Sequence, residues 1–459
     1  LAVIMASSRD YCYRSKVWTA YRNAAGGKKM RDLYSDFVEL ANDAYRVLGY
    51  EDMRHNWISA YESETFEEDI LKLHNKLRPL YVQLHAYVRR KLKARYGEDK
   101  FPSSGHIPAH ILGDMWAQDW STLIEDMRPY PNLSTFDLTN EMIRQNYTVL
   151  KMVQAADNFF QSLGLKAMPP RFWEKSLFES PTDGRQVACH AEAVDFRNRR
   201  DYRIRMCATV TMADLETIYH EMGHIQYFLQ YAHQPYLSRI SPHTGFHEAV
   251  GDTIALSAMT PHNLYSIGLL NQPFDDPQSE LNYLMLMALR RISLIPPSFL
   301  VDQWRWKVFR GEITKENYNK EWWNFKCKYQ GIYPPVTRLS EDFDAGSIYH
   351  ISHNVNYISY FLSFVLQFQF HKALCEAAGF DGPLHRCNIY NSTRAGTKLS
   401  EMLRHGATQT WQKSLRVLTG TNRMDAQPLL DYFEPLMEYL KNENLEDIDW
   451  QPNCPLNNN

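Results

Sequence analysis

An apolar-rich run from 215 to 231 contains the sequence His220-Glu221-Met222-Gly223-His224-Ile225-Gln226-Tyr227-Phe228. Asp214 stands just before this run, and aspartate is a favourable residue at a helix start, so we predict a helix here. On a helix the two histidines, at positions i and i+4, project from one face and can bind the same zinc ion. Matches to this short motif also arise by chance in ordinary helices, so it needs a second element.

The second element is His247-Glu248-Ala249-Val250-Gly251-Asp252. A hydrolytic zinc site uses three protein ligands and keeps one position open. We predict that Glu248 is the third ligand beside His220 and His224, and that Glu221 is the general base toward the attacking water. Asp252 follows Glu248 by one helical turn, where its carboxylate can accept the free N–H of a metal-binding histidine. Two separate motifs at this separation predict a zinc-dependent peptidase.

Over most of the chain, apolar residues recur at three- and four-residue intervals, which is typical of amphipathic helices. An apolar stripe of Phe37, Leu40, Ala41, Ala44 and Leu48 predicts a helix that ends at Gly49, and a second helix is predicted over 66–96, before Gly97. Strand-like alternation is confined to 186–190 and 202–210, so we expect a small antiparallel sheet beside the metal helix. The loops rich in proline and glycine, such as 272–277, are too short to be interdomain linkers. The prediction is one continuous, mainly α body.

Composition limits the class of partner. With 50 lysines and arginines against 53 aspartates and glutamates, the net charge is -3, which offers no electrostatic footprint for nucleic acid or an anionic membrane. The most apolar run that stands out, 357–370, is broken by two serines and two glutamines, and the apolar opening at 1–6 is too short for a signal peptide. We therefore expect no nucleic-acid partner and no membrane anchor in this chain.

The seven cysteines offer two candidate disulfides. Cys189 and Cys207 bracket a short segment, as do Cys375 and Cys387. The alternative is that all seven are buried thiols of a cytosolic protein. The unassigned cysteines are Cys12, Cys327 and Cys454, and a pairing of the last two is only a guess.

Three glycosylation sequons begin at Asn132, Asn146 and Asn391. Each sequon alone is a weak signal, because the pattern is short. Together with the cysteine pairs, the sequons favour a secreted glycoprotein.

The residues around both motifs resemble the angiotensin-converting enzyme family. The resemblance includes the metal helix, Gly245-Phe246-His247-Glu248, Ile107-Pro108-Ala109-His110 and the runs 300–306 and 313–318, and it covers almost the whole chain. It implies a large, ellipsoidal, helical zinc-peptidase fold with a deep central channel. It also implies a peptidyl-dipeptidase that releases C-terminal dipeptides from small peptides, with chloride as a further ion.

Position by position, the resemblance assigns further roles. Tyr360 corresponds to the tyrosine that stabilises the oxyanion, and His350 to a histidine that acts in the transition state. His190 and Ala191 correspond to residues that contact the peptide substrate. A lone tyrosine or histidine in an aromatic-rich helical protein is usually a packing residue, so these assignments rest on the resemblance.

The resemblance also has departures at the substrate carboxylate. The family binds the C-terminal carboxylate with Gln, Lys and Tyr, of which Gln118 and Tyr357 are present, whereas the lysine position is Ile348. Loss of that cation removes a charge-assisted hydrogen bond, worth roughly 1.5–3 kcal/mol. We therefore expect weakened binding of the substrate C-terminus and a raised KM.

The chloride sites are altered as well. The residues of the first site correspond to Arg22, Trp322 and Lys326, with lysine in place of arginine, so positive charge is kept without the bidentate guanidinium. In the second site Tyr61 is present, but the arginine position is Ser359. We expect weak chloride activation.

The start of the chain is a further departure. Met5-Ala6-Ser7-Ser8-Arg9 resembles a segment that family members reach only after several N-terminal helices, which cover the channel. We interpret residues 1–459 as a single peptidase catalytic domain without these lid helices, with a cleft that is more open to water.

Two other functions stay open. A mono-carboxypeptidase of the same family would carry an arginine at the position of Gln118, which argues against it. A peptide-binding homologue with impaired catalysis is favoured by Ile348, Ser359 and the missing lid, but opposed by the retained metal and catalytic residues. Zinc content together with product analysis would separate the three.

Overall fold

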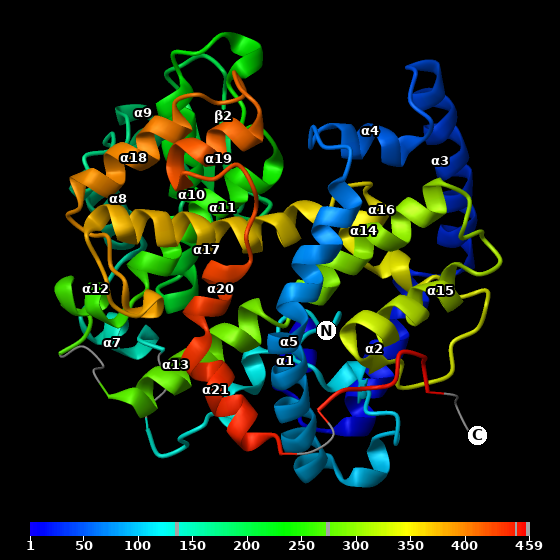
Figure 1. Ribbon diagram of the computed structural model, residues 1–459. Coiled ribbons are helices and arrows are strands. Elements are labelled where there is room, and N and C mark those ends of the chain that lie inside the picture. The colour runs from blue at the N-terminus through cyan, green and yellow to red at the C-terminus, as the bar shows by residue number, and fades with distance from the viewer. Residues whose placement is uncertain (134–136, 272–275, 446–447, 456–459) are drawn as a thin grey trace. The chain divides into compact units, whose positions relative to one another are not determined.

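The computed structural model describes residues 1–133, 137–271, 276–445 and 448–455. Helices dominate these residues, as predicted, and the strands among them form two two-stranded sheets (Figure 1). The chain divides into two compact units. Unit 1 comprises Leu1–Ser134, Gln278–Phe361 and Phe433–Asn459, and unit 2 comprises Thr135–Pro277 and Leu362–Tyr432. Most of the predicted loop 272–277 lies outside the described residues.

Unit 1 is helical, with a short parallel ladder between β1 (Ile107–Pro108) and β4 (Ile332–Tyr333). Its longest helix, α5, has the bounds that were predicted, and Gly97 ends it in the left-handed region at φ 92°. The helices that lie in unit 1, apart from Pro277, are α1 (Ala2–Ser7), α2 (Tyr11–Ala25), α3 (Lys28–Val47), α4 (Met53–Ser59), α5 (Phe66–Tyr96), α6 (Ile124–Met127), α13 (Pro277–Arg291), α14 (Ile295–Phe309), α15 (Tyr318–Phe325), α16 (Tyr349–Ser352) and α21 (Glu434–Glu443).

The sequence correctly predicted a helix at α3. It did not correctly predict which face of this helix is buried. Asn42 lies on the buried face, where its side chain accepts a hydrogen bond from the backbone of Met53 at 3.0 Å and donates one to the carbonyl of Phe309 at 2.9 Å. Leu40 and Leu48 of the predicted apolar stripe are 71% and 69% exposed. The polar contacts of Asn42 fix the orientation of this helix, which hydrophobic periodicity alone does not reveal.

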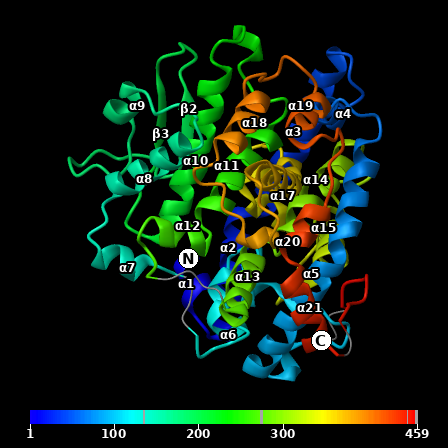
Figure 2. The ribbon, with the colours of Figure 1, turned by 60° about the vertical axis from the view of Figure 1, so that its left-hand side comes forward.

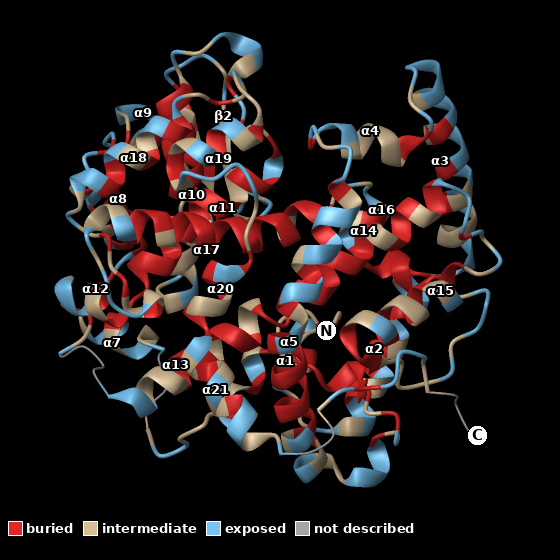
Figure 3. Cartoon of the chain, viewed as in Figure 1, coloured by how far each residue is buried: buried red, intermediate tan, exposed pale blue. Residues whose placement is uncertain are grey.

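Unit 2 is built around α10 and α11, which lie side by side in both views (Figures 1 and 2). Helix α8 also packs on α10, and buried residues are concentrated on α10, α11 and the part of α17 in this unit (Figure 3). The helices of unit 2 are α7 (Thr139–Arg144), α8 (Val149–Ser162), α9 (Pro170–Lys175), α10 (Met212–Tyr231), α11 (Thr244–Ala258), α12 (Pro261–Ser266), α17 (Ile358–Ala378, from Leu362 on), α18 (Thr393–Leu403), α19 (Trp411–Thr419) and α20 (Gln427–Tyr432).

The predicted small sheet lies against α10, but one strand is displaced along the chain. Strands β2 (Glu192–Asp195) and β3 (Tyr202–Arg205) pair antiparallel, and both contact α10. The segment 186–190, which was predicted as a strand, is irregular and largely exposed, so that prediction is wrong. The tight connection explains the shift, because Phe196 donates to the carbonyl of Asp201 at 3.1 Å and so starts the pairing at 195 and 202.

Three disulfides are formed. Cys189 with Cys207 and Cys375 with Cys387 are the two pairs expected from spacing. The third bond joins Cys327 to Cys454, the pairing that the sequence left as a guess, and Cys12 is a free, exposed thiol. Each disulfide joins two cysteines of the same unit, and each restricts the unfolded chain.

One helical stretch among the described residues, Pro277–Phe309, is long and apolar enough to cross a membrane by length and composition. It did not stand out in the sequence, because charged residues at 290, 291 and 302 interrupt it. In its most apolar window, with a mean hydropathy of 1.5, 78% of the residues are buried inside the protein. Since the core helices of soluble proteins have the same properties, this stretch is weak evidence for a membrane span.

Candidate metal centre and substrate-binding residues

Helix α10 begins three residues before the position that Asp214 suggested. Thr211 is the N-cap, and its hydroxyl accepts the backbone N–H of Asp214 at 3.1 Å. Asp214 lies in the first turn, where a negative charge is favourable. From this start the helix continues without interruption through His220, Glu221 and His224, so the two histidines share one face as predicted.

Two glycines allow α11 to approach α10 closely. A Cβ atom on Gly223 would lie 2.7 Å from the Cα atom of Gly251. A Cβ atom on Gly251 would lie 2.7 Å from the carbonyl oxygen of His220 and 2.8 Å from its Nδ1. Real Cβ atoms do not approach other atoms so closely, so glycine at both positions is what brings Glu248 on α11 within reach of the histidines on α10.

The three predicted ligands meet in unit 2. Nε2 of His220 lies 3.1 Å from Nε2 of His224 and 3.4 Å from Oε2 of Glu248. One ligand atom from each of the three residues lies within 4.8 Å of the others. Two imidazole nitrogens and one carboxylate oxygen fit a zinc ion that keeps a fourth position open.

The electrostatics of this cluster also favour a cation. Burial lowers the pKa of His220, but its contacts with Asp252 and Glu248 outweigh this and hold that pKa well above the usual value. Burial, helped by His220, lowers the pKa of His224 to about 4, which keeps that ring in the neutral form that binds metals. The carboxylates thus select a positive charge at the place where the ligand atoms converge.

Both histidines are oriented through their second ring nitrogen. Nδ1 of His220 lies 3.1 Å from Oδ1 of Asp252, the residue predicted for this contact. Nδ1 of His224 lies 2.7 Å from Nδ1 of His247, which the sequence had not pointed out. The only sequence signal for His247 is its place directly before the ligand Glu248. These contacts leave both Nε2 atoms free to face the ligand cluster.

Glu221 is the predicted general base. It is buried on α10, and its Oε2 has no hydrogen-bond partner among the described residues. Burial raises its pKa to about 7, against an opposing effect of His220. A carboxyl group with a pKa near neutrality can both accept and return a proton, as the predicted general base must.

The predicted peptide contacts His190 and Ala191 also belong to unit 2. They lie between the disulfide at Cys189 and the start of β2, the strand that packs on α10. His190 is exposed and Ala191 is half-buried. Their side chains are therefore accessible to a ligand.

Unit 1 holds the other predicted catalytic and substrate residues as one aromatic cluster. Nε2 of His350 lies 3.1 Å from the hydroxyl of Tyr360, and the hydroxyl of Tyr357 donates to Oε1 of Gln118 at 3.1 Å. The rings of His350 and Tyr357 are 4.7 Å apart, and those of Tyr357 and Tyr360 are 5.2 Å apart. Residues separated by more than two hundred positions thus meet in one group.

A fully buried ion pair on α14 holds this cluster in place. Asp302 pairs with Arg305, and both side chains are 0% exposed. Arg305 donates to the carbonyl of His350 at 2.9 Å, while Oδ2 of Asp302 accepts the backbone N–H groups of Tyr357 at 2.7 Å and Ile358 at 2.6 Å. The pair therefore fixes both ends of the segment that carries the cluster, and sequence reasoning missed it.

Gln118 is held by a strained turn. The residue before it, Ala117, is fully buried and has φ 57°, a left-handed conformation that is uncommon for a residue with a Cβ atom. Asp114 supports the turn, because its Oδ1 accepts the backbone N–H of Trp116 at 3.0 Å and that of Gln118 at 2.9 Å. Strain that the surrounding contacts enforce is typical of functional positions.

The two substituted positions are Ile348 and Ser359, neither of which carries a charge. Ile348, at the family's lysine position, is only 5% exposed. The backbone N–H of Ser359 donates to Oδ1 of Asn356 at 3.2 Å, and the hydroxyl of Tyr61 donates to the same oxygen at 3.4 Å. An asparagine thus joins Tyr61 to Ser359 where the second chloride site was expected.

The first predicted anion site contains two buried cations. Arg22 is 5% and Lys326 is 3% exposed, and neither forms a salt bridge among the described residues. Nε and Nη1 of Arg22 are buried without a hydrogen-bond partner, whereas Lys326 donates to Gln330 at 3.0 Å and lies 5.1 Å from the ring of Trp322. Burial and the nearby Arg22 lower the pKa of Lys326 to about 7. Asp114 attracts both cations, and the buried N–H groups of Arg22 that lack a partner still favour an anion here.

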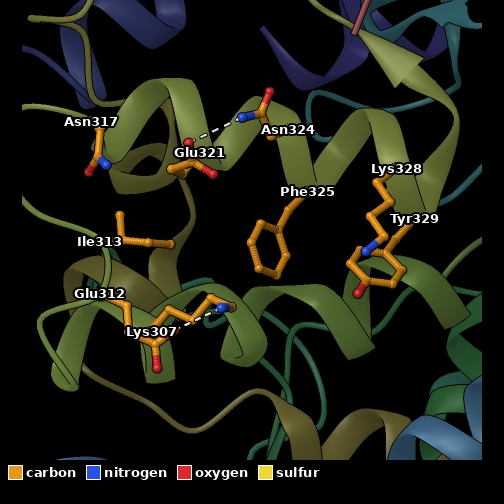
Figure 4. Close-up of a pocket in the computed structure, with 9 residues that line it drawn as sticks. All are labelled: Lys307, Glu312, Ile313, Asn317, Glu321, Asn324, Phe325, Lys328 and Tyr329. Carbon is orange, nitrogen blue, oxygen red and sulfur yellow. Dashed lines mark hydrogen bonds and ion pairs between the residues drawn. The ribbon is translucent and has the colours of Figure 1, made fainter. Parts of the chain in front are cut away.

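A separate cavity of about 400 Å³ lies in unit 1 beside α14 and α15 (Figure 4). Lys307 binds Glu312 at 2.7 Å and Asn324 binds Glu321 at 3.2 Å in its wall. None of the residues predicted for the metal, the substrate or the anion lines this cavity. The lining residues are Lys307, Glu312, Ile313, Asn317, Glu321, Asn324, Phe325, Lys328 and Tyr329.

The comparison with known proteins agrees with these features. The peptidase M2 family, described as angiotensin-converting enzyme, matches residues 1–450. The angiotensin-converting enzyme of Theromyzon tessulatum is 48% identical over 450 residues, which are 98% of this chain and 73% of that protein. That of Bos taurus is 47% identical over 465 residues, which are 100% of this chain and 36% of that protein.

A third relative is the angiotensin-converting enzyme-like protein Ace3 of Mus musculus, 46% identical over 449 residues, which are 98% of this chain and 61% of that protein. The chain thus spans 36% of the length of the bovine relative and a larger share of the other two. The match over nearly its whole length, with the ligand cluster in place, decides the family. The chain belongs to the angiotensin-converting enzyme family of peptidases.

Proposed function

We propose that this chain is a zinc-dependent peptidyl-dipeptidase that removes dipeptides from the C-termini of small peptides. The observation that carries the proposal is the meeting of His220, His224 and Glu248, whose ligand atoms lie within 4.8 Å of one another. Two histidines and a glutamate are a ligand set of hydrolytic zinc enzymes. Membership of a peptidase family supports peptide substrates.

Zinc held by these residues would polarise the scissile carbonyl and make water more acidic. Glu221 is the general base in this proposal. Its buried carboxyl, with a pKa raised to about 7, takes the proton from the attacking water and later delivers it to the departing amine. Asp252 holds His220 in the tautomer that presents Nε2 to the ligand cluster.

The family resemblance assigns the remaining roles to His190, Ala191 and residues of the aromatic cluster in unit 1. Tyr360 donates its hydroxyl to the developing oxyanion, and His350, which contacts that hydroxyl at 3.1 Å, supports it. His190 and Ala191 contact the peptide backbone. Gln118 and Tyr357, which already share a hydrogen bond, hold the terminal carboxylate of the substrate. Because Ile348 offers no cation, this contact is weaker than one assisted by lysine.

Chloride has a secondary place in the proposal. Arg22 and Lys326, with Trp322 beside Lys326, form one anion site, whereas the arginine position of the second site is the uncharged Ser359. We therefore expect weak chloride activation through the first site alone.

Three features support an extracellular location. Disulfides are stable in oxidising compartments, and this chain has three. Asn146 and Asn391 are exposed and so accessible to glycosylation. Asn132 is also exposed, although Ser134, which completes its sequon, lies outside the described residues.

We also propose that residues 1–459 form a single peptidase catalytic domain. In this proposal the domain has no nucleic-acid partner.

Product analysis on a short peptide tests the function. Release of dipeptides that stops on chelation is expected, and Glu221→Gln should abolish it while zinc stays bound. Single amino acids would instead indicate a mono-carboxypeptidase, which Gln118 argues against. Bound zinc without cleavage would indicate a peptide-binding homologue, and either result would overturn the proposal.

A further inference from the structure

His247 lies in the first turn of α11, directly before the ligand Glu248, and its ring faces α10. Its Nδ1 lies 2.7 Å from Nδ1 of His224. The ring is enclosed by aromatic side chains of α10, with its centroid 4.7 Å from Tyr227 and 5.0 Å from Phe228. His247 thus has a fixed place between the metal helix and the third ligand.

The contact between the two rings fixes where their protons lie. Two Nδ1 atoms at 2.7 Å must share one proton, because one nitrogen has to donate and the other to accept. His224 directs its Nε2 toward Nε2 of His220, at 3.1 Å, where the metal ligands converge. A histidine that uses Nε2 for a metal carries its proton on Nδ1. His224 is therefore the donor, and the acceptors within its reach are Nδ1 of His247 and the backbone carbonyl of the same residue.

We propose that His247 is a positioning residue that accepts the Nδ1 proton of His224 and thereby fixes the tautomer and the ring plane of this zinc ligand. The inference rests on the proposed zinc site. It gives the two histidine ligands different supports. His220 is held by the carboxylate of Asp252, whereas His224 is held by a second imidazole.

Charge explains why the second support is a neutral ring. The carboxylates of Glu248 and Asp252 already match the two positive charges of a zinc ion. A further carboxylate beside His224 would leave the site with a net negative charge and weaken the metal as a Lewis acid. An imidazole acceptor orients His224 without adding charge.

The surroundings of His247 argue against a packing role. Its Nε2 is buried without a hydrogen-bond partner among the described residues, and a buried polar group without a partner is destabilising. Phenylalanine would fill the same space between Tyr227 and Phe228 without this cost. The acceptor atom Nδ1 is what phenylalanine lacks.

Zinc affinity of the full chain is the direct test. Zinc is removed, and its dissociation constant is measured by competition with a chromophoric chelator, without any peptide substrate. For His247→Phe we expect affinity to fall about 10–100-fold. His247→Asn, whose amide oxygen can accept the same proton, should recover most of it. His243→Phe is the matched control, because His243 is a buried histidine at the start of the same helix, and this variant should keep the wild-type affinity.

Equal zinc affinity of wild type and His247→Phe would overturn the inference, as would an equal loss in His243→Phe. If the wild type itself binds no zinc, the proposed function fails instead. If wild-type zinc affinity is shown but His247→Phe does not fold, selective ¹⁵N labelling of histidine in the wild type tests the inference instead.

In the zinc form, the ¹⁵N signals should show His247 protonated on Nε2 only. A proton on its Nδ1 would overturn the inference.

Discussion

In unit 2 the predicted metal ligands come from two helices in direct contact, α10 and α11, whereas in unit 1 the aromatic cluster is assembled from segments far apart in the chain. Glycines at 223 and 251 set the first geometry, through close backbone contact. A buried ion pair between Asp302 and Arg305 sets the second, through hydrogen bonds to the backbone. Close helix packing thus brings the predicted metal ligands together, whereas long-range polar contacts assemble the aromatic cluster.

The largest expected effect is in the metal region. Glu221→Gln keeps the size of the side chain but cannot accept a proton, so kcat should fall about 10²–10⁴-fold. Zinc content should stay at the wild-type level, because Glu221 is not a ligand. Steady-state kinetics with metal analysis check this, and a variant that keeps its activity would remove Glu221 from its role.

The corresponding change in the other region is Asp302→Asn. It leaves Arg305 as an uncompensated buried charge, which costs about 3–5 kcal/mol of folding free energy. Because the ion pair fixes the cluster of His350 and Tyr357, activity should fall with stability. Denaturant unfolding checks this. Asp431→Asn, which removes a half-exposed ion pair with Lys372, is the matched control and should cost under about 1 kcal/mol.

Ile348→Lys tests the substrate carboxylate. A cation at this position should add about 1.5–3 kcal/mol of binding, or roughly tenfold to a hundredfold in KM, for peptides with a free C-terminus. Amidated peptides should gain nothing. In the wild type, a strong preference for the free acid would show that the loss of the lysine is already compensated.

Gly251→Ala tests the helix contact directly. The added Cβ would meet the backbone and ring of His220, so stability should fall by about 1–3 kcal/mol and zinc affinity should weaken. A second glycine-to-alanine change, Gly268→Ala, is a poor control. Gly268 has a left-handed φ of 76°, so alanine would add backbone strain of its own there. Ala255→Gly, at a buried position of the same helix, is the better control, because it removes a methyl group and adds no atom that could meet His220. Calorimetry and chelator competition distinguish the two variants, and unchanged zinc affinity in Gly251→Ala would contradict the account.

The smallest effect concerns the anion site. The pKa of Lys326 is lowered to about 7, so its ammonium loses the proton as pH rises through that value, and anion affinity should fall with it. Below about pH 6 the site should bind chloride more tightly than above about pH 8. Lys326→Arg should remove this dependence, because arginine stays protonated. Quenching of tryptophan fluorescence by bromide measures the binding, and a pH-independent wild type would contradict the prediction.

The sequence predicted the parts of the molecule that depend on local pattern. The metal helix, α5 with its glycine end and the cysteine pairs at 189/207 and 375/387 follow from periodicity, capping and spacing. Local pattern did not reveal the inward face of α3, because Asn42 sets it by tertiary hydrogen bonds. Nor did it reveal the register of β2, which the turn at 196–201 decides.

The candidate site divides in the same way. His220, His224, Glu248 and Asp252 could be predicted because each motif lies on one helix, and helical spacing fixes which side chains share a face. The pair of Asp302 and Arg305 could not, because its partners are carbonyl and N–H groups some fifty residues away. His247 adjoins a ligand in sequence, but only the packing of α11 on α10 brings it to His224.

The central claim is a zinc site in unit 2 that drives the release of dipeptides. It is tested most directly by removing the metal from the purified chain, adding zinc back in measured amounts and following the products from a peptide with a free C-terminus. The account predicts that dipeptide release is lost with the metal and returns fully at one equivalent of zinc, and that His220→Ala shows neither zinc binding nor release. Release that persists without metal, or that survives in His220→Ala, would contradict it.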